Sequence, residues 1–208
     1  MTPAEFRKRL GQLQEVITRG LHYYAAWKNL RFYKEGEVSW SLEEQNEVFD
    51  RFRGFFTPVV GALLNMALMQ FAKVFDRNRR TASLWNLLEA ARQDTSLVPG
   101  HTSVEVDAVS SQLQESERTL TGLKRMRDQQ LAHVDANPAP VDPLLAGEFD
   151  LLVERVKSAS NWLSTAHGGH WGSWELQLRE VEWQTSRIVG VLVEELHRKR
   201  LKAEQIQS

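Results

Sequence analysis

The chain has 208 residues, of which 42% are hydrophobic and 25% are charged, and its formal net charge is −1. This length and apolar share allow one substantial domain or two small ones. The near-neutral charge argues against a strongly basic nucleic-acid binder, although it does not exclude a local basic patch. The chain has no cysteine, which excludes disulfides and thiolate metal sites and fits a cytoplasmic protein. The first residues lack the basic-then-apolar order of a signal peptide.

The first helix is predicted to begin at Thr2, which can cap it, with Pro3 in the first turn and Glu5 completing a capping box. The helix is expected to fade over residues 32–36. Its inner face is predicted from apolar residues at helical spacing, namely Leu10, Leu13, Ile17, Leu21, Tyr24 and Trp27.

A second helical tract is predicted from Ser41, which forms a capping box with Glu44, to about Phe75. Pro58 is expected to kink or divide it. Residues 54–72 carry no charge, and such a run is long enough to be considered a membrane span. Polar residues inside the run and basic residues at both ends favour a fully buried central helix instead, so we expect no membrane partner.

Residues 76–80 form a polar break that contains three arginines. A short amphipathic helix over 83–93 and a loop over 95–101 are predicted to follow it. Thr102 and Glu105 then form a third capping box, which starts a long helix.

This long helix is predicted to run on into the 130s without a break. Its apolar stripe comprises Val109, Leu113, Leu120, Leu123, Leu131 and Val134. Arg127 falls in line with these leucines in seven-residue steps, and a buried guanidinium needs a partner. His133, which titrates near neutral pH, lies roughly 120° around the helix from Arg127 and about 9 Å along it. The two side chains therefore converge only through the reach of arginine, a break in the helix, or a second copy of the chain.

The Pro-containing residues 137–140 cannot continue a helix. Further helices are predicted over 142–166 and 173–202, with a loop over 167–172 between them and a frayed tail over 203–208. Because no strand pattern appears, the sequence predicts an all-α, single-domain bundle of about five to seven helices.

Arg127, the polar Asp128 and His133, with five residues between arginine and histidine, resemble the signature of the HEPN (higher eukaryotes and prokaryotes nucleotide-binding) superfamily. The surrounding Arg-Asp-Gln-Gln-Leu-Ala-His-Val-Asp is similar to the AbiU-like branch, named after an abortive-infection protein. The segment 75–84 also resembles that branch. The resemblance implies a HEPN-like helical bundle that forms a homodimer and acts as a metal-independent endoribonuclease without a cofactor. It further implies a role in phage defence, or as a toxin with a possible antitoxin protein.

On this resemblance, His133 would move the proton of a ribose 2′-hydroxyl or of the leaving oxygen, and Arg127 would neutralise charge on the phosphate. Asp128, which stands where Asn is frequent, would hold the imidazole or shape the helix end. No metal is implied, because the nucleophile belongs to the RNA. The alternative is structural: Arg127 pairs with a carboxylate across the bundle, and His133 is stabilised by the helix dipole.

Two basic clusters accompany these segments: Arg77, Arg79 and Arg80, and Lys124 with Arg125. They are candidates for binding the RNA backbone. The alternative is a solvated surface with scattered ion pairs.

Other residues admit less specific interpretations. His167 and His170 flank two glycines, but further metal ligands cannot be identified, so a flexible turn is favoured. Four tryptophans near that turn fit a core or an oligomer interface better than base stacking; they are Trp162, Trp171, Trp174 and Trp183. A second hypothesis for the whole chain is a non-catalytic HEPN-fold module that binds nucleotide, RNA or a partner protein.

Overall fold

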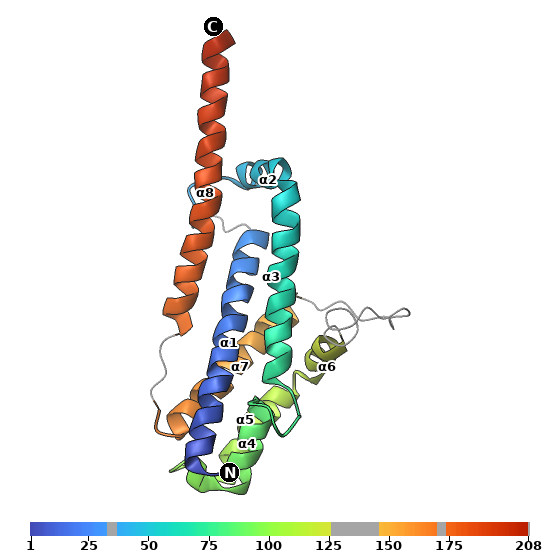
Figure 1. Ribbon diagram of the computed structural model, residues 1–208, viewed down its shortest axis with the longest axis vertical. Helices are drawn as coiled ribbons and strands as arrows, with labels where there is room; N and C mark the ends of the chain where they lie inside the picture. The colour runs from blue at the N-terminus through green and yellow to red at the C-terminus, as the bar shows by residue number, and fades with distance from the viewer. Residues whose placement is uncertain (33–36, 126–145, 170–173, 208) are drawn as a thin grey trace. The chain divides into compact units, whose positions relative to one another are not determined.

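The computed structural model describes residues 1–32, 37–125, 146–169 and 174–207. Over these residues the chain forms eight α-helices and one short 3-10 helix, without a strand (Figure 1), which confirms the all-α prediction. The helices are α1 (Pro3–Arg31), α2 (Leu42–Arg51), α3 (Arg53–Val74), α4 (Leu84–Gln93), η1 (Thr95–Leu97), α5 (Ser103–Gln114), α6 (Glu117–Arg125), α7 (Ala146–Ala166) and α8 (Trp174–Gln207). The capping boxes predicted at Ser41 and Thr102 both form.

The helices group into two compact units. Unit 1 comprises residues 1–21 and 66–174, and unit 2 comprises residues 22–65 and 175–208. Helices α1 and α3 contribute residues to both units. The single-domain organisation inferred from the sequence stays a prediction.

Unit 1 is built where α1, α3 and α7 bring apolar side chains together. Helix α1 passes close to α3 at Gly20, where an added Cβ would lie 3.3 Å from the ring of Phe71. Phe71 in turn meets Phe149 of α7 edge-on, with ring centroids 5.5 Å apart. Helix α4 packs against α5, and α5 packs against α7 (Figure 1). The glycine thus lets a core phenylalanine reach the backbone of α1.

The long helix predicted from Thr102 into the 130s is wrong, because α5 ends at Gln114 and α6 begins at Glu117. Arg155 of α7 holds this break. Its Nη2 donates to Glu115 Oε2 and its Nη1 donates to Ser116 Oγ, each at 2.5 Å. A cation from another helix therefore stabilises the two residues between α5 and α6, a contact that helical periodicity cannot reveal.

Unit 2 has its own hydrophobic cluster, which joins the end of α1 to α2, α3 and α8. The rings of Phe49 and Phe56 stack with centroids 4.4 Å apart. Its buried members are Leu30, Val48, Phe56, Val189, Val193 and Leu196. Two ion pairs then tie α8 to α2: His197 Nε2 lies 2.5 Å from Glu44 Oε1, and Arg200 pairs with Glu47.

Of the two effects predicted for Pro58, a division of the second helical tract at this residue is wrong, and a kink stays a prediction. The division lies at Phe52, and α3 continues through Pro58. A proline there removes the N–H that would bond to the carbonyl of Gly54. Gly54 is exposed, so water can reach that carbonyl.

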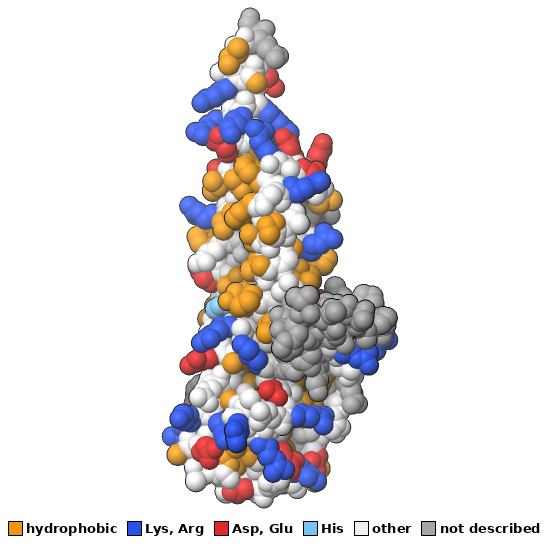
Figure 2. Space-filling view, turned by 45° about the vertical axis from the view of Figure 1, so that its right-hand side comes forward, with side chains coloured by type: hydrophobic (Ala, Val, Ile, Leu, Met, Phe, Trp, Pro, Cys, Tyr) orange, Lys and Arg blue, Asp and Glu red, His pale blue; other side chains and the backbone are white. Residues whose placement is uncertain are grey.

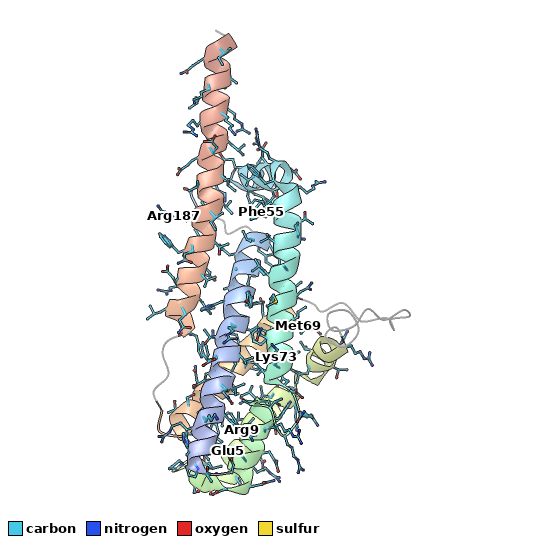
Figure 3. All side chains as sticks on the ribbon, viewed as in Figure 1. Glu5, Arg9, Phe55, Met69, Lys73 and Arg187 are labelled. Carbon is cyan, nitrogen blue, oxygen red and sulfur yellow. The ribbon has the colours of Figure 1, made fainter. Side chains whose placement is uncertain are left out.

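The prediction that residues 54–72 form a fully buried helix is also wrong for the first half of α3. Phe55, labelled in Figure 3, is 59% exposed, and Figure 2 shows hydrophobic side chains at the surface of the protein. By length and composition alone, helix α3 could cross a membrane. Of its most apolar 18-residue segment, 33% is buried in the protein. Burial concentrates in its second half, at Leu68, Phe71 and Val74.

Helix α7 is followed by the non-helical residues 167–169. Gly168 has a φ of 77°, a left-handed conformation that favours glycine. Helix α8 starts at Trp174 and continues to Gln207, beyond the end predicted near Lys202. Its last turns are exposed.

Candidate functional site

The α3–α4 loop, residues 75–83, is folded around the side chain and carbonyl of Asn78. The backbone N–H of Asn78 donates to Asp76 Oδ1, and the N–H of Arg80 donates to Asn78 Oδ1, each at 3.0 Å. Thr81 Oγ1 and Asn86 Nδ2 both donate to the Asn78 carbonyl at 2.7 Å. Hydrogen bonds within the loop and from α4 thus fix its backbone.

Helix α1 supports the same loop from the other side. Arg9 Nη1 donates to the Arg79 carbonyl at 2.8 Å, and Arg9 Nη2 pairs with Glu5 Oε1 at 2.7 Å. Figure 3 labels Glu5 and Arg9 on the first turns of α1. Arg9 therefore positions the loop and has its charge partly neutralised by its own helix.

The basic side chains at this loop are exposed and unpaired within the described part of the chain. Arg77, Arg79 and Arg80 form no ion pair there, and neither does Lys73 at the end of α3. These arginines are solvated, as the structural alternative also expects, but they take no part in the ion pairs that it includes. Their charges are available to an anion from solution.

Two aromatic rings extend this basic surface. The guanidinium of Arg77 lies over the ring of Trp85, 5.5 Å from its centroid. The ring of Phe75 lies 6.2 Å from that of Trp85, tilted by 54°. Both rings are half-buried, so one cation of the loop rests on a partly exposed aromatic surface.

The second basic cluster lies at the end of α6, which packs against α7. Lys124 is in this helix, and Arg125 is its last residue and is exposed. Arg127, Asp128 and His133 lie outside the described residues, so their convergence stays a prediction. The chain enters this motif two residues after α6 ends.

His167 has a packing role. Its Nδ1 lies 2.7 Å from the Leu97 carbonyl, and its ring lies 4.9 Å from that of Phe6. His170 lies outside the described residues. Within the described ranges, no three His, Asp or Glu side chains gather as a metal site would require.

The tryptophans near the α7–α8 connection have different environments. Trp174 is buried and Trp162 is half-buried, as a core assignment expects. Trp183 is 56% exposed, and Trp171 lies outside the described residues.

Sequence reasoning missed Trp85 and Asn86 as partners of the basic loop. They belong to α4, and no helical period connects α4 to residues 77–80 across an irregular segment. An aromatic residue two positions after the Ser83 cap is the one local signal. In the sequence, Lys73 is distinguished only as the basic residue that follows the uncharged residues 54–72.

A match to a family model identifies the chain as a HEPN protein, in agreement with its all-α fold. Within that superfamily it belongs to the AbiU2 family, whose model matches residues 3–182. No curated protein and no solved structure matches the chain. The matched range includes the α3–α4 loop and the motif, whereas residues 183–208 lie beyond it.

Proposed function

We propose that this AbiU2-family protein is a metal-independent endoribonuclease that acts in the cytoplasm, in phage defence or as the toxin of a toxin–antitoxin pair. The observation that carries the proposal is the presence of Arg127, Asp128 and His133 within the residues that match the family model. The unpaired arginines of the α3–α4 loop support it, because they can bind phosphates.

In this mechanism, His133 removes the proton of a ribose 2′-hydroxyl. The 2′-oxygen then attacks the adjacent phosphorus, and Arg127 neutralises the charge that builds on the phosphate oxygens. The bond from phosphorus to the 5′-oxygen breaks, and that oxygen takes up a proton. The products are a 2′,3′-cyclic phosphate and a 5′-hydroxyl, so neither a metal nor a cofactor is required.

A homodimer would complete this site. One histidine takes the proton from the nucleophile, and a second copy of His133 could give a proton to the leaving oxygen. An isologous two-fold arrangement is the commonest way to bring two copies together. We place the axis near residues 135–140, with Asp128 orienting the imidazole. A strictly monomeric species in light scattering at about 50 µM would contradict this assembly, since interfaces that complete a site are specific and stable.

The deciding experiment measures RNA cleavage and melting temperature together, for the parent and for His133→Ala, Arg127→Ala and Arg127→Lys. Cleavage by His133→Ala should fall by about two orders of magnitude. Arg127→Lys should not restore activity, because an ammonium cannot reproduce the planar guanidinium. Combining His133→Ala with Arg127→Ala should lower cleavage by less than the product of the two single losses. Chelators should have no effect on cleavage. His101→Ala is the matched control and should cleave like the parent.

If both alanine variants cleave like the parent while Arg127→Ala alone melts early, the enzyme proposal is wrong. The alternative would then be a non-catalytic module that binds nucleotide, RNA or a partner protein such as an antitoxin.

A further inference from the structure

We propose that the α3–α4 loop and Trp85 form a subsite for one unpaired nucleotide of single-stranded RNA, a proposal that rests on the proposed function for the presence of RNA. The base stacks on the guanidinium of Arg77, which lies over Trp85, and the flanking phosphates bind Arg79 and Arg80. Trp85 is thereby assigned a role in substrate binding.

The first argument is the geometry of the stack. A guanidinium is planar and has two faces, and the Cζ of Arg77 lies over the indole of Trp85, 5.5 Å from its centroid. Since Arg77 is exposed, its other side is open to a ligand. Bases of single-stranded RNA stack on both aromatic rings and arginine planes, so an arginine held on a tryptophan is a suitable platform.

The second argument is that the charges of this loop are kept free. Some arginines elsewhere in unit 1 are engaged, since Arg155 pairs with Glu115 and Arg92 pairs with Asp107. In the loop, Asn78 Oδ1 accepts from the Arg80 N–H and Arg9 donates to the Arg79 carbonyl, so these backbone contacts do not use a loop arginine side chain. A fixed backbone with free cations lowers the ordering cost of binding a phosphate chain.

The third argument selects unpaired RNA over a duplex. In a duplex, neighbouring bases cover both faces of each base, and the A-form major groove is too narrow for side chains to enter. A duplex could offer phosphates to Arg79 and Arg80, but it could not offer a base to Arg77. The combination of a stacked cation with adjacent free cations therefore fits a single strand.

The test uses the full-length protein and 2′-O-methyl oligonucleotides, which cannot be cleaved because the 2′-oxygen is blocked. Fluorescence anisotropy would measure affinity for a single-stranded 12-mer and for a duplex of the same length. Trp85→Leu should weaken single-strand binding by about tenfold and leave duplex binding unchanged. Arg77→Gln should weaken both, with the larger loss on the single strand. Trp85→Phe should restore most of the affinity, which separates a stacking loss from misfolding.

Unit 2 offers a matched control, because Arg187 lies over Trp183 at a similar distance of 5.3 Å. Trp183→Leu and Arg187→Gln should bind both probes like the parent. Equal losses for Trp85→Leu and Trp183→Leu, or a duplex bound as tightly as the single strand, would overturn the subsite. If these results contradict the subsite but cleavage still depends on His133, the proposed ribonuclease activity is unaffected. The two proposals can therefore be tested independently.

Discussion

The two arginine–tryptophan pairs in the described part of the chain have nearly the same distance but different surroundings. Arg77 lies 5.5 Å from the ring centroid of Trp85 in unit 1, and Arg187 lies 5.3 Å from that of Trp183 in unit 2 (Arg187 is labelled in Figure 3). In the loop, Arg77 is preceded by Asp76, whose carboxylate accepts from the Asn78 N–H, and is followed by the exposed Arg79 and Arg80. Arg187 instead lines a groove of about 500 Å³ that also contains Glu37, Glu194 and the indole of Trp40, among other residues.

The difference teaches that the contact itself does not define a binding site. Cation–π pairs are frequent in proteins and mainly stabilise local structure. The sign of the neighbouring charge decides what ligand can approach. A phosphate entering the groove of unit 2 would meet two carboxylates beside Arg187, whereas the α3–α4 loop has three exposed arginines and one carboxylate, that of Asp76.

The largest expected effect comes from reversing the charge beside Arg77. The double variant Arg79→Glu/Arg80→Glu should lower affinity for single-stranded RNA more than tenfold. The slope of log affinity against log salt should decrease by about 1.4, as expected when two phosphate contacts to a single strand are lost. Arg198→Glu/Lys199→Glu on α8, where both cations already pair with Glu195, is the control. Similar losses for the two double variants would mean that net charge, and not the loop, governs binding.

A substitution in unit 2 is expected to lower the stability of the protein and to leave its affinity for RNA unchanged. In Gly190→Ala the new Cβ would lie 3.0 Å from the ring of Trp40, and overpacking of this kind costs about 1–3 kcal/mol. Calorimetry should show a lower melting temperature, with unchanged RNA affinity. Gly61→Ala on α3, whose Cβ would meet nothing within 4 Å, should instead raise stability slightly. If Gly190→Ala weakens RNA binding, the groove of unit 2 takes part in it.

A smaller effect should follow from loosening the α3–α4 loop. Asn78→Ala removes the acceptor for the Arg80 N–H but leaves every cation in place. RNA affinity should fall about threefold, since the loop must then be ordered on binding. Asn65→Ala on the exposed side of α3 should leave affinity unchanged in the same titration. An unaltered affinity for Asn78→Ala would show that the arginines bind without a preformed loop.

The smallest effect concerns pH and compares one capping box from each unit. Hydrogen bonds from the Ser41 backbone and side chain, followed by His197, lower the pKa of Glu44; those from Thr102, followed by His101, lower the pKa of Glu105. A lowered folded-state pKa means that each carboxylate stabilises the protein above its ordinary pKa of about 4.3. The contribution is lost as the pH falls through the lowered value.

Melting temperatures of Glu44→Gln and Glu105→Gln should therefore approach that of the parent as the pH falls below about 4. A gap that stays constant with pH would assign the stabilisation to packing of the side chains and not to their charge.

Local sequence signals predicted the helix starts well, because caps depend on residues close in the chain. Ser41 with Glu44 and Thr102 with Glu105 form the expected boxes. The helix breaks were harder. Pro58 is tolerated near the start of α3, whereas Phe52, which has no breaking tendency of its own, ends α2.

The candidate site shows the same limit. The arginines of the α3–α4 loop stand out in the sequence because they are clustered. Their availability does not, since it depends on Arg9 and Asn86, which arrive from other helices. Trp85 matters because Arg77 lies over its ring. The two residues are joined by an irregular loop, so helical periodicity cannot predict this contact.

Arg155 has a consequence for how this sequence can diverge. It binds a carboxylate at position 115 and a hydroxyl at position 116 with separate N–H groups, so the two residues are constrained differently. An exchange of charge between 115 and 155 would keep the ion pair but leave Ser116 without its donor. Among related chains we therefore expect positions 115 and 155 to covary, with position 116 limited to small hydroxyl residues wherever arginine occupies 155.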